Sequence, residues 1–537
     1  MLKNRMRAAL LLLVGVLTLS GLGGVHQVSA AADVPVGPIK WGACPDVGGA
    51  PRPAELQCAK ITVPLDYRKP NGNKISVAVS RLAAANPSER RGVLLLNPGG
   101  PGGQGIDMPL WMSAIMPPEI SKKYDLIGFD PRFVGLSTPV SCGLAFEDAM
   151  YVAPPLERQG GFDKTVQFMN STAKACYKKS GWMLPHATTA NTARDMDVIR
   201  RGLGVEKISY FGYSYGTYLG AAYAGLFPAR TDRFILDSST GPQGNWRETF
   251  RAWGQAGEVR FSDFAQFAVE HEAVFHLGKT EDQVRLTYFQ LMEKLRKNPI
   301  DLGDPLLNDV WFRAITFSAL YNDATLPALA NFWQTVKEEP VATKLAPLVR
   351  DLAPADDPVK YPNIPEDNSA AAAVAVLCGD AFWSRNVDQY RWELKLDSQR
   401  HPMFGPLGSN IWPCAWWQNP SELPVAINGN GPVNKILILQ NLRDPATPYW
   451  TGAEMRSALG RRARMVTVDQ GGHGAAYIGF NACANNAATA YLTKGVYPSK
   501  DAYCAAESPV ETFGSQGRDV AASKRDQAIR DLYRQMR

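Results

Sequence analysis

The chain is poor in histidine and has little excess charge. Its 537 residues include only 6 histidines, and charged residues make up 20% of the total. The formal net charge is +6, and the basic residues are scattered rather than clustered. A scattered charge of this size does not form the basic surface that nucleic acids require, so we expect no nucleic-acid partner. The 45% hydrophobic content is typical of a globular protein with a substantial core.

Long apolar runs are confined to the N-terminus. Three basic residues precede the apolar stretch 8–17, and Val28-Ser29-Ala30 supplies small residues for cleavage. This pattern predicts a secretory signal peptide over residues 1–30. A membrane anchor is the alternative, but Gly and Ser interrupt the apolar run soon after Leu19. We therefore expect a secreted, extracellular protein that is not held in a membrane after the signal is removed.

Metal-binding patterns are also lacking. There is no Cys-x-x-Cys pair, and the closest approach to a zinc helix is the segment from His271 to His276. Zinc helices place two histidines four residues apart, on one face of the helix. A spacing of five residues rotates the two side chains about 140° apart on a helix, so they cannot share one ion. We expect no metal site.

Eight cysteines are present, and an even number in an exported chain favours disulfide bonds over metal ligation. The sequence does not determine the connectivity, and free buried thiols are the alternative. Pairing neighbours along the chain closes the shortest loops and is the arrangement we expect. The expected pairs are Cys44 with Cys58, Cys142 with Cys176, Cys378 with Cys414, and Cys483 with Cys504.

Short apolar runs alternate with helical patterns up to about residue 240, which predicts a mainly parallel α/β sheet. Strand patterns are scarce over 241–432, where helical and Trp-rich segments dominate, and they return after residue 433. We therefore predict one α/β core, formed by 31–240 and 433–537, that is interrupted by a mostly helical lid at 241–432. The expected strands are 61–66, 75–82, 92–97, 124–130, 207–211, 233–237, 435–439 and 464–468, and the expected helices include 192–203, 215–227 and 370–376.

The segment Gly212-Tyr213-Ser214-Tyr215-Gly216 follows a predicted strand and precedes a helical pattern. In this setting Gly-x-Ser-x-Gly forms a sharp turn that presents the serine at the carboxyl edge of the sheet. A simple glycine-rich turn between strand and helix is the alternative. The pattern makes Ser214 the candidate nucleophile.

A nucleophilic serine needs a base to take its proton and an acid to orient that base. In this architecture the chain order is Ser, Asp, His. Asp444 and His473 each follow one of the last two predicted strands, and glycines flank His473. We predict Asp444 as the acid and His473 as the base. Asp237 is the alternative acid, and Asp469 is expected to be a loop or strand-end residue.

A second group of glycines follows a strand in the segment Asn97–Gly105. Backbone amides of such a loop can bind a developing oxyanion, and we expect the N–H groups of Gly100 and Tyr215 to be the two donors. The same glycines match Gly-x-Gly-x-x-Gly of dinucleotide sites, with Asp130 ending the next strand. A dinucleotide site leaves the Ser–Asp–His series unexplained, so we expect no cofactor.

Taken together, these motifs resemble those of the α/β-hydrolase-fold serine aminopeptidases, the relatives of prolyl aminopeptidase. The similarity is strongest to the secreted tripeptidyl aminopeptidases of actinomycete-type bacteria, and it extends over nearly all of the mature chain. Two positions depart from the family pattern: Asn97-Pro98 stands where many relatives have histidine, and Phe133 stands where glycine is common. The matching segments are 97–103, 130–137, 212–216, 377–380, 443–445 and 472–474.

The resemblance implies an α/β-hydrolase fold with Ser214 as nucleophile, Asp444 as acid and His473 as base. It also implies a secreted exopeptidase that releases tripeptides, through an acyl-enzyme, from peptides and proteins with a free N-terminus. An esterase or lipase-like hydrolase and a prolyl-type aminopeptidase could use the same three residues, and a binding protein could keep the fold alone. An exopeptidase needs a carboxylate for the substrate ammonium; the candidates are Glu248, Glu258, Glu270, Glu272 and Asp380.

Overall fold

The computed structural model describes most of the chain, and the signal peptide predicted for residues 1–30 lies outside the described part. The described residues are 34–302, 306–352, 363–433, 435–507 and 520–536. None of the helices in these ranges is both long enough and apolar enough to cross a membrane.

One sheet of ten strands organises the described residues, in the order β1-β2-β3-β5-β4-β6-β7-β8-β9-β10. The pairs from β1 to β5 along this order are antiparallel, and all pairs from β5 onward are parallel. The expectation of a mainly parallel sheet is therefore confirmed. The strands are β1 Gly42–Ala43, β2 Leu56–Pro64, β3 Lys74–Leu82, β4 Gly92–Asn97, β5 Tyr124–Phe129, β6 Ile208–Tyr213, β7 Thr231–Asp237, β8 Ile436–Arg443, β9 Ala463–Gly471 and β10 Ala502–Cys504.

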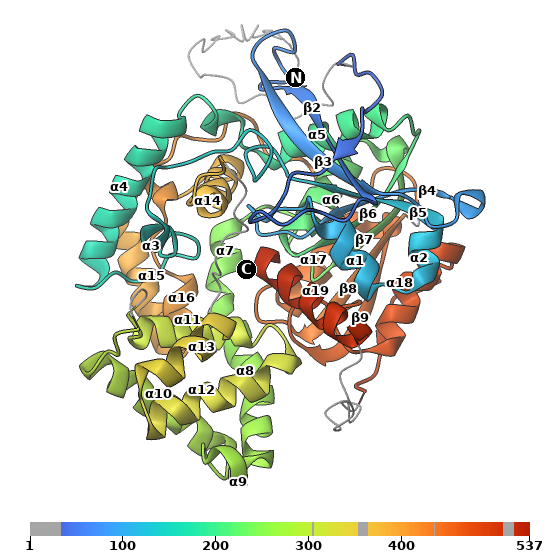
Figure 1. Ribbon diagram of the computed structural model, residues 1–537. Coiled ribbons are helices and arrows are strands. Elements are labelled where there is room, and N and C mark those ends of the chain that lie inside the picture. The colour runs from blue at the N-terminus through green and yellow to red at the C-terminus, as the bar shows by residue number, and fades with distance from the viewer. Residues whose placement is uncertain (1–33, 303–305, 353–362, 434, 508–519, 537) are drawn as a thin grey trace, which may run out of the picture.

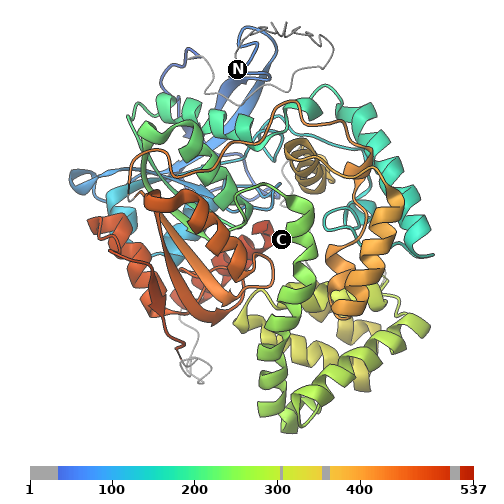
Figure 2. The same cartoon turned by 180° about the vertical axis from the view of Figure 1, so that it is seen from behind.

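Helices cover both faces of the sheet, which explains why the central strands are buried and largely apolar. Every residue of β5 and β6 is buried, as expected for parallel strands packed on both sides. Figure 1 shows α1 (Met108–Ile115) and α19 (Val520–Met536) in front of the sheet, and Figure 2 shows α6 (Tyr215–Leu226) on the opposite side. Further helices around the core are α2 Pro118–Lys123, α5 Thr189–Gly202, α17 Tyr449–Leu459 and α18 Ala482–Lys494.

A large helical region lies between β7 and β8 and forms the lower and left part of the molecule in Figure 1. Buried aromatic rings hold it together, with Trp333 in ring contact with Phe261, Tyr288 and Phe312. Its α-helices are α7 Trp246–Arg251, α8 Trp253–Glu270, α9 Glu272–Phe275, α10 Glu281–Lys297, α11 Asp309–Ala319, α12 Leu326–Glu338, α13 Ala342–Leu352, α14 Asn368–Asp380, α15 Val387–Arg400 and α16 Gly405–Gly408.

One helix from the first half of the chain joins this region. The helix α4 (Phe162–Ser180) precedes the serine motif in sequence, yet its Met169 packs in a small cluster with Tyr390, Ile411 and Ala415. Figure 1 shows α4, with the short helix α3 (Phe146–Ala149), beside α14 and α15 and away from the sheet. The helical layer over the sheet is therefore assembled from two separate stretches of chain.

The sequence placed the central strands more accurately than the edges of the sheet. The predicted strand 92–97 coincides with β4, whereas β2 begins at Leu56, five residues before the predicted start at Ile61. β2 pairs with β3 over its whole length, and its exposed face carries polar residues that hide the strand pattern. The short strands β1 and β10 have no sequence signal at all.

All four expected disulfide bonds are present. They join Cys44 to Cys58, Cys142 to Cys176, Cys378 to Cys414, and Cys483 to Cys504. Pairing of neighbours is confirmed, and each bond closes a loop within one local part of the fold.

We expect loss of the Cys378–Cys414 bond, by double substitution to alanine, to lower the free energy of unfolding by up to about 4 kcal/mol. The bond closes a loop of 36 residues, and a longer loop restricts the unfolded chain more. Loss of Cys44–Cys58, which closes a loop of 14 residues, should cost about 1 kcal/mol less. Denaturant unfolding without reductant measures both, and an equal or reversed order would contradict the loop-length argument.

Candidate active site

Ser214 occupies a strained turn between β6 and α6. Its backbone has φ 55° and ψ −125°, a conformation that costs a non-glycine residue roughly 1–3 kcal/mol. The flanking glycines permit the turn, because a Cβ on Gly212 would lie 2.6 Å from the Tyr210 ring. A Cβ on Gly216 would lie 2.7 Å from Asn97 Oδ1. The turn places Ser214 at the carboxyl end of β6, as predicted from the motif.

The structure brings Asp444 and His473 into contact. Nδ1 of His473 lies 3.0 Å from Oδ1 and 2.9 Å from Oδ2 of Asp444, and both side chains are buried. The carboxylate also accepts the backbone N–H groups of Ala446 and Thr447 and the Thr447 hydroxyl, each at 2.9 Å. These bonds fix the carboxylate so that it faces the imidazole.

The second ring nitrogen of His473 has no hydrogen-bond partner within the part of the chain that the structure describes, although it is buried. The contact of Nδ1 with Asp444 favours the tautomer in which Nδ1 carries the proton and Nε2 is an acceptor. A nitrogen in this state can take a proton from a hydroxyl group.

Two residues of the helical region hold this histidine and the loop of its partner Asp444. The backbone N–H of His473 donates to the carbonyl oxygen of Tyr321 at 2.8 Å, and the two rings meet edge to face with centroids 5.0 Å apart. Trp253 of α8 donates its indole N–H to the Ala446 carbonyl, in the loop that carries Asp444. No sequence motif indicated either residue.

Asp237, the alternative acid, binds backbone groups instead of the imidazole. Its carboxylate accepts the N–H groups of Ala475 and Ala476 at 2.7 and 2.8 Å, and its carbonyl oxygen accepts the N–H of Ser214 at 3.1 Å. Complete burial raises the pKa of Asp237 to about 7. The choice between the two carboxylates is settled geometrically in favour of Asp444 as the partner of His473.

Asp469 lies in β9 and forms an ion pair with Arg443; hydrogen bonds from Arg443 and Tyr503 lower the pKa of Asp469. This position agrees with the expectation of a strand-end residue.

The glycine loop 99–105 packs closely beside the serine turn. A Cβ on Gly99 would lie 3.0 Å from Ser214 Cβ and 3.2 Å from Tyr215 N. Gly100 has φ 102° and lines the same cavity as Ser214 and Tyr215. Tyr215 is the first residue of α6, so its N–H has no acceptor within the helix. Both expected donors are therefore close to the serine.

The dinucleotide interpretation of this loop needs a free carboxylate at Asp130, and the structure does not provide one. Asp130 is buried, and its carboxylate accepts the N–H groups of Gly105, Ile106 and Leu136 at 2.8–3.0 Å. Burial raises its pKa to about 7. The carboxylate thus holds two loops together, and the nearby Phe133 adopts φ 73°, a conformation in which glycine would be unstrained.

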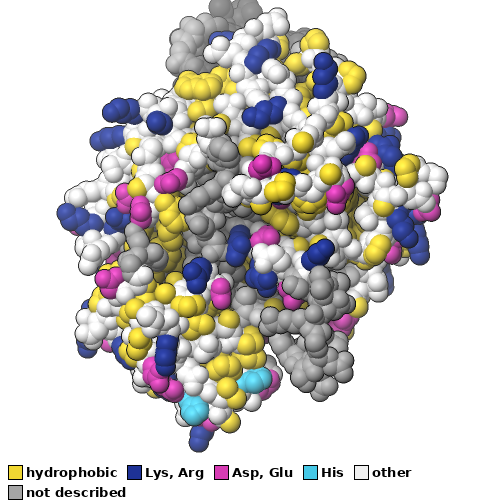
Figure 3. Space-filling model, in the orientation of Figure 1, with side chains coloured by type: hydrophobic (Ala, Val, Ile, Leu, Met, Phe, Trp, Pro, Cys, Tyr) yellow, Lys and Arg dark blue, Asp and Glu magenta, His cyan; other side chains and the backbone are white. Residues whose placement is uncertain are grey.

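A cavity of about 430 Å³ opens beside Ser214. Its volume lies within the range of roughly 300–1,000 Å³ typical of small-ligand sites. Figure 3 shows hydrophobic side chains on both sides of the centre of this face, where the helical region meets the sheet. The aromatic residues lining the cavity include Trp246, Phe250, Trp253, Trp311, Phe317, Tyr321 and Trp412.

None of the five carboxylates proposed for the substrate ammonium lines this cavity. Asp380, for example, is buried against Thr189, whose N–H and hydroxyl it accepts, and burial raises its pKa to about 7. The acidic residues that do line the cavity are Asp107, Glu366 and Asp531. Asp107 and Asp531 lie outside the helical insertion, and Glu366 lies within it. The sequence analysis indicated none of the three.

The two histidines that resemble a zinc site flank α9 instead of sharing one helix. His271 bonds the Phe267 carbonyl and His276 the Ala273 carbonyl. Across the described ranges there is no group of three or more His, Cys, Asp or Glu side chains suited to a metal ion.

The fold and these residues define a serine hydrolase of the α/β-hydrolase fold. A family model described as TAP-like protein matches residues 401–504. The chain is 34% identical to the tripeptidyl aminopeptidase of Streptomyces lividans, covering 89% of this chain and 88% of that protein. It is 30% identical to the serine protease Hip1 of Mycobacterium tuberculosis, covering 87% and 91%. It is also 31% identical to the carboxylesterase B of the same organism, covering 92% and 96%.

Among solved structures, the proline iminopeptidase-related protein TTHA1809 of Thermus thermophilus is 12% identical with a TM-score of 0.32, covering 82% of this chain and 99% of that one. The family is identified by the sequence identity to the three proteins above, which extends over most of each chain. The chain belongs to the tripeptidyl aminopeptidase family of serine peptidases.

We expect Asp444→Asn and Asp237→Asn to fail in different ways. Asp444→Asn should lower kcat by about 10³–10⁴-fold with little change in melting temperature, because the imidazole loses the group that orients it. Asp237→Asn should mainly lower stability, by about 1–3 kcal/mol, because one buried N–H group loses its acceptor. Parallel kinetics and thermal unfolding separate the two roles, and equal melting temperatures with equal activity loss would contradict the assignment.

Proposed function

We propose that the protein is a secreted exopeptidase that releases tripeptides from the free N-termini of peptides and proteins. The observation that carries this proposal is the position of Ser214 on the cavity wall, with the buried Asp444–His473 pair held near it, since Asp237 bonds both the serine turn and the loop after His473. The family relationship supports the peptidase chemistry. The four disulfide bonds support secretion, since such bonds persist in oxidising compartments.

In the proposed mechanism, Nε2 of His473 takes the proton of Ser214 as Oγ attacks the scissile carbonyl. Asp444 orients the ring and stabilises the imidazolium that results. The imidazolium then gives its proton to the leaving amine, which departs and leaves an acyl-enzyme on Ser214. A water molecule, activated by the same histidine, hydrolyses the ester and restores the serine.

The tetrahedral intermediate carries negative charge on the former carbonyl oxygen, and the N–H groups of Gly100 and Tyr215 are the proposed donors to it. Donors on a rigid backbone need no reorganisation when the charge develops, which makes them effective. The close packing of Gly99 on Ser214 and Tyr215 supports this proposal, because it brings the glycine loop next to the nucleophile.

An esterase is the second candidate, because one similar protein is named carboxylesterase B and the cavity wall is rich in aromatic residues. Hydrolysis of an amide requires protonation of its poor leaving group, whereas hydrolysis of an activated ester does not. Substrate comparison therefore distinguishes the two functions.

We expect a chromogenic tripeptidyl amide with a free amine to be cleaved much faster than its N-acetylated form. The physical reason is that the proposed site accepts the end of a chain and not its middle. Initial rates with both amides and a matched ester test this, with Ser214→Ala as the inactive control. Turnover of the ester alone would leave the serine chemistry intact and refute the peptidase assignment.

Gly100→Ala should lower kcat by about 10²–10³-fold, the usual effect of losing one oxyanion donor. The added Cβ would lie 2.9 Å from the backbone nitrogens of Gly102 and Gly103, so the loop must shift. Gly92→Ala is the matched control, since a Cβ there meets no atom within 4 Å and the residue begins the strand leading to the same loop. Normal kcat in Gly100→Ala would exclude Gly100 as a donor.

A further inference from the structure

The last turn of α19 forms part of the wall of the candidate active-site cavity. Asp531, Arg534, Gln535 and Met536 line the same cavity as Ser214. Met536 is only 3% exposed and belongs to the main hydrophobic core, whereas Arg534 is exposed. The last turn of α19 therefore contributes both buried and exposed residues to the cavity wall.

This turn is fastened to the glycine loop beside the serine. The side-chain oxygen of Gln535 accepts the backbone N–H of Gln104 at 2.8 Å. A Cβ on Gly103 would lie 2.4 Å from the Gln535 carbonyl oxygen, so only glycine allows this approach. The rest of α19 is held by Leu532 and Tyr533, which are buried.

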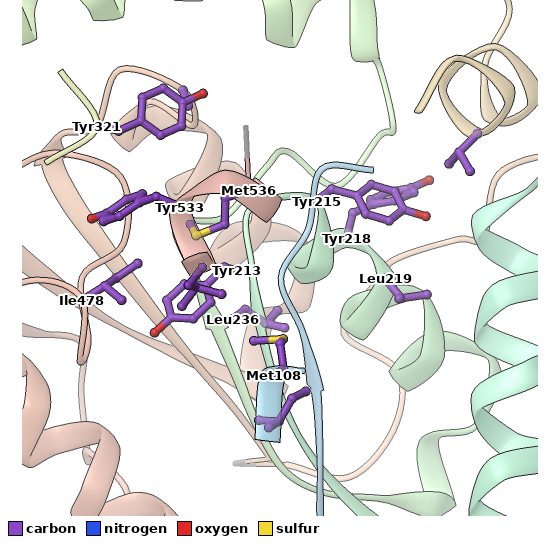
Figure 4. Close-up of a cluster of buried hydrophobic side chains, with 14 of the residues drawn as sticks. Met108, Tyr213, Tyr215, Tyr218, Leu219, Leu236, Tyr321, Ile478, Tyr533 and Met536 are labelled. Carbon is purple, nitrogen blue, oxygen red and sulfur yellow. The ribbon is translucent and has the colours of Figure 1, made fainter. Parts of the chain in front are cut away.

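The figures place the end of α19 at the centre of the molecule. Figure 1 shows the C-terminal end of the described chain between the sheet and the helical region. Figure 4 shows Tyr533 and Met536 in one cluster with Tyr213, which precedes Ser214, and with Tyr321, which contacts His473. The helix end is thus a built part of the site and not a loose tail over its entrance.

We propose that the last turn of α19, chiefly Met536 and Gln535, ends the cavity on the side of the substrate N-terminus and so limits the acyl part to three residues. This inference rests on the proposed function. The leaving side must admit the remainder of a peptide or protein, so a wall within the cavity is compatible with exopeptidase activity only on the N-terminal side. An extended tripeptide spans about 10 Å, so a wall at that distance from Ser214 would exclude a fourth residue.

The test is a truncation that ends the chain at Tyr533, which keeps the buried anchors of α19. We compare kcat/KM for tripeptidyl, tetrapeptidyl and pentapeptidyl chromogenic amides with free amines, and for an N-acetylated tripeptidyl amide. The truncation should reduce the preference for the free tripeptide over the longer and blocked substrates by at least about 10-fold. Each rate is divided by that for a short acetyl ester, which does not reach the wall, so that any general loss from the missing Gln535–Gln104 bond to the glycine loop cancels.

Met536→Ala is the milder variant and should shift the preference in the same direction while leaving the Gln535–Gln104 bond in place. Arg530→Ala, on the exposed side of α19, is the matched control and should retain the full preference. If the full chain cleaves no tripeptidyl amide, the proposed function itself fails. If the full chain prefers tripeptides and both Met536→Ala and the truncation keep that preference while hydrolysing the ester, the α19 wall is refuted.

Discussion

The site depends on the bonds that the end of β7 makes to two loops far apart in the sequence. The carbonyl oxygen of Asp237 holds the N–H of Ser214, and its carboxylate holds the two residues that follow Gly474. The hydroxyl oxygen of Ser238 accepts a further bond from the N–H of Gly474 at 2.7 Å. Because each buried N–H left without an acceptor costs about 1–3 kcal/mol, these bonds strongly restrict how the serine turn and the histidine loop lie relative to each other.

The helical region takes part in the site as well as covering it. Tyr321 accepts the backbone N–H of His473, and Trp253 donates to the loop of Asp444. A chain of ring contacts continues from Tyr321 through Phe317 to Trp253, along the cavity wall. A displacement of these helices would therefore move the imidazole and its acid together with the substrate pocket.

Local patterns account for the parts of the fold that were predicted correctly. The strand 92–97 and the turn at Ser214 are dictated by neighbouring residues: an apolar run, and two glycines whose missing side chains allow the strained backbone. The choice between Asp237 and Asp444 could not be made this way. Asp237 ends one parallel strand and Asp444 follows its neighbour, and only the contact with the His473 ring distinguishes them.

The sequence by itself determined the α/β class and the serine turn; it also indicated the candidate nucleophile, acid and base, and it favoured the pairing of neighbouring cysteines without determining it. These features depend on residues close together in the chain or on a motif of known chemistry. The tertiary structure alone decided which carboxylates line the cavity, and that Tyr321 and Met536 belong to the site. Such contacts join segments more than a hundred residues apart, and their geometry follows from packing of the whole core, which no local pattern encodes.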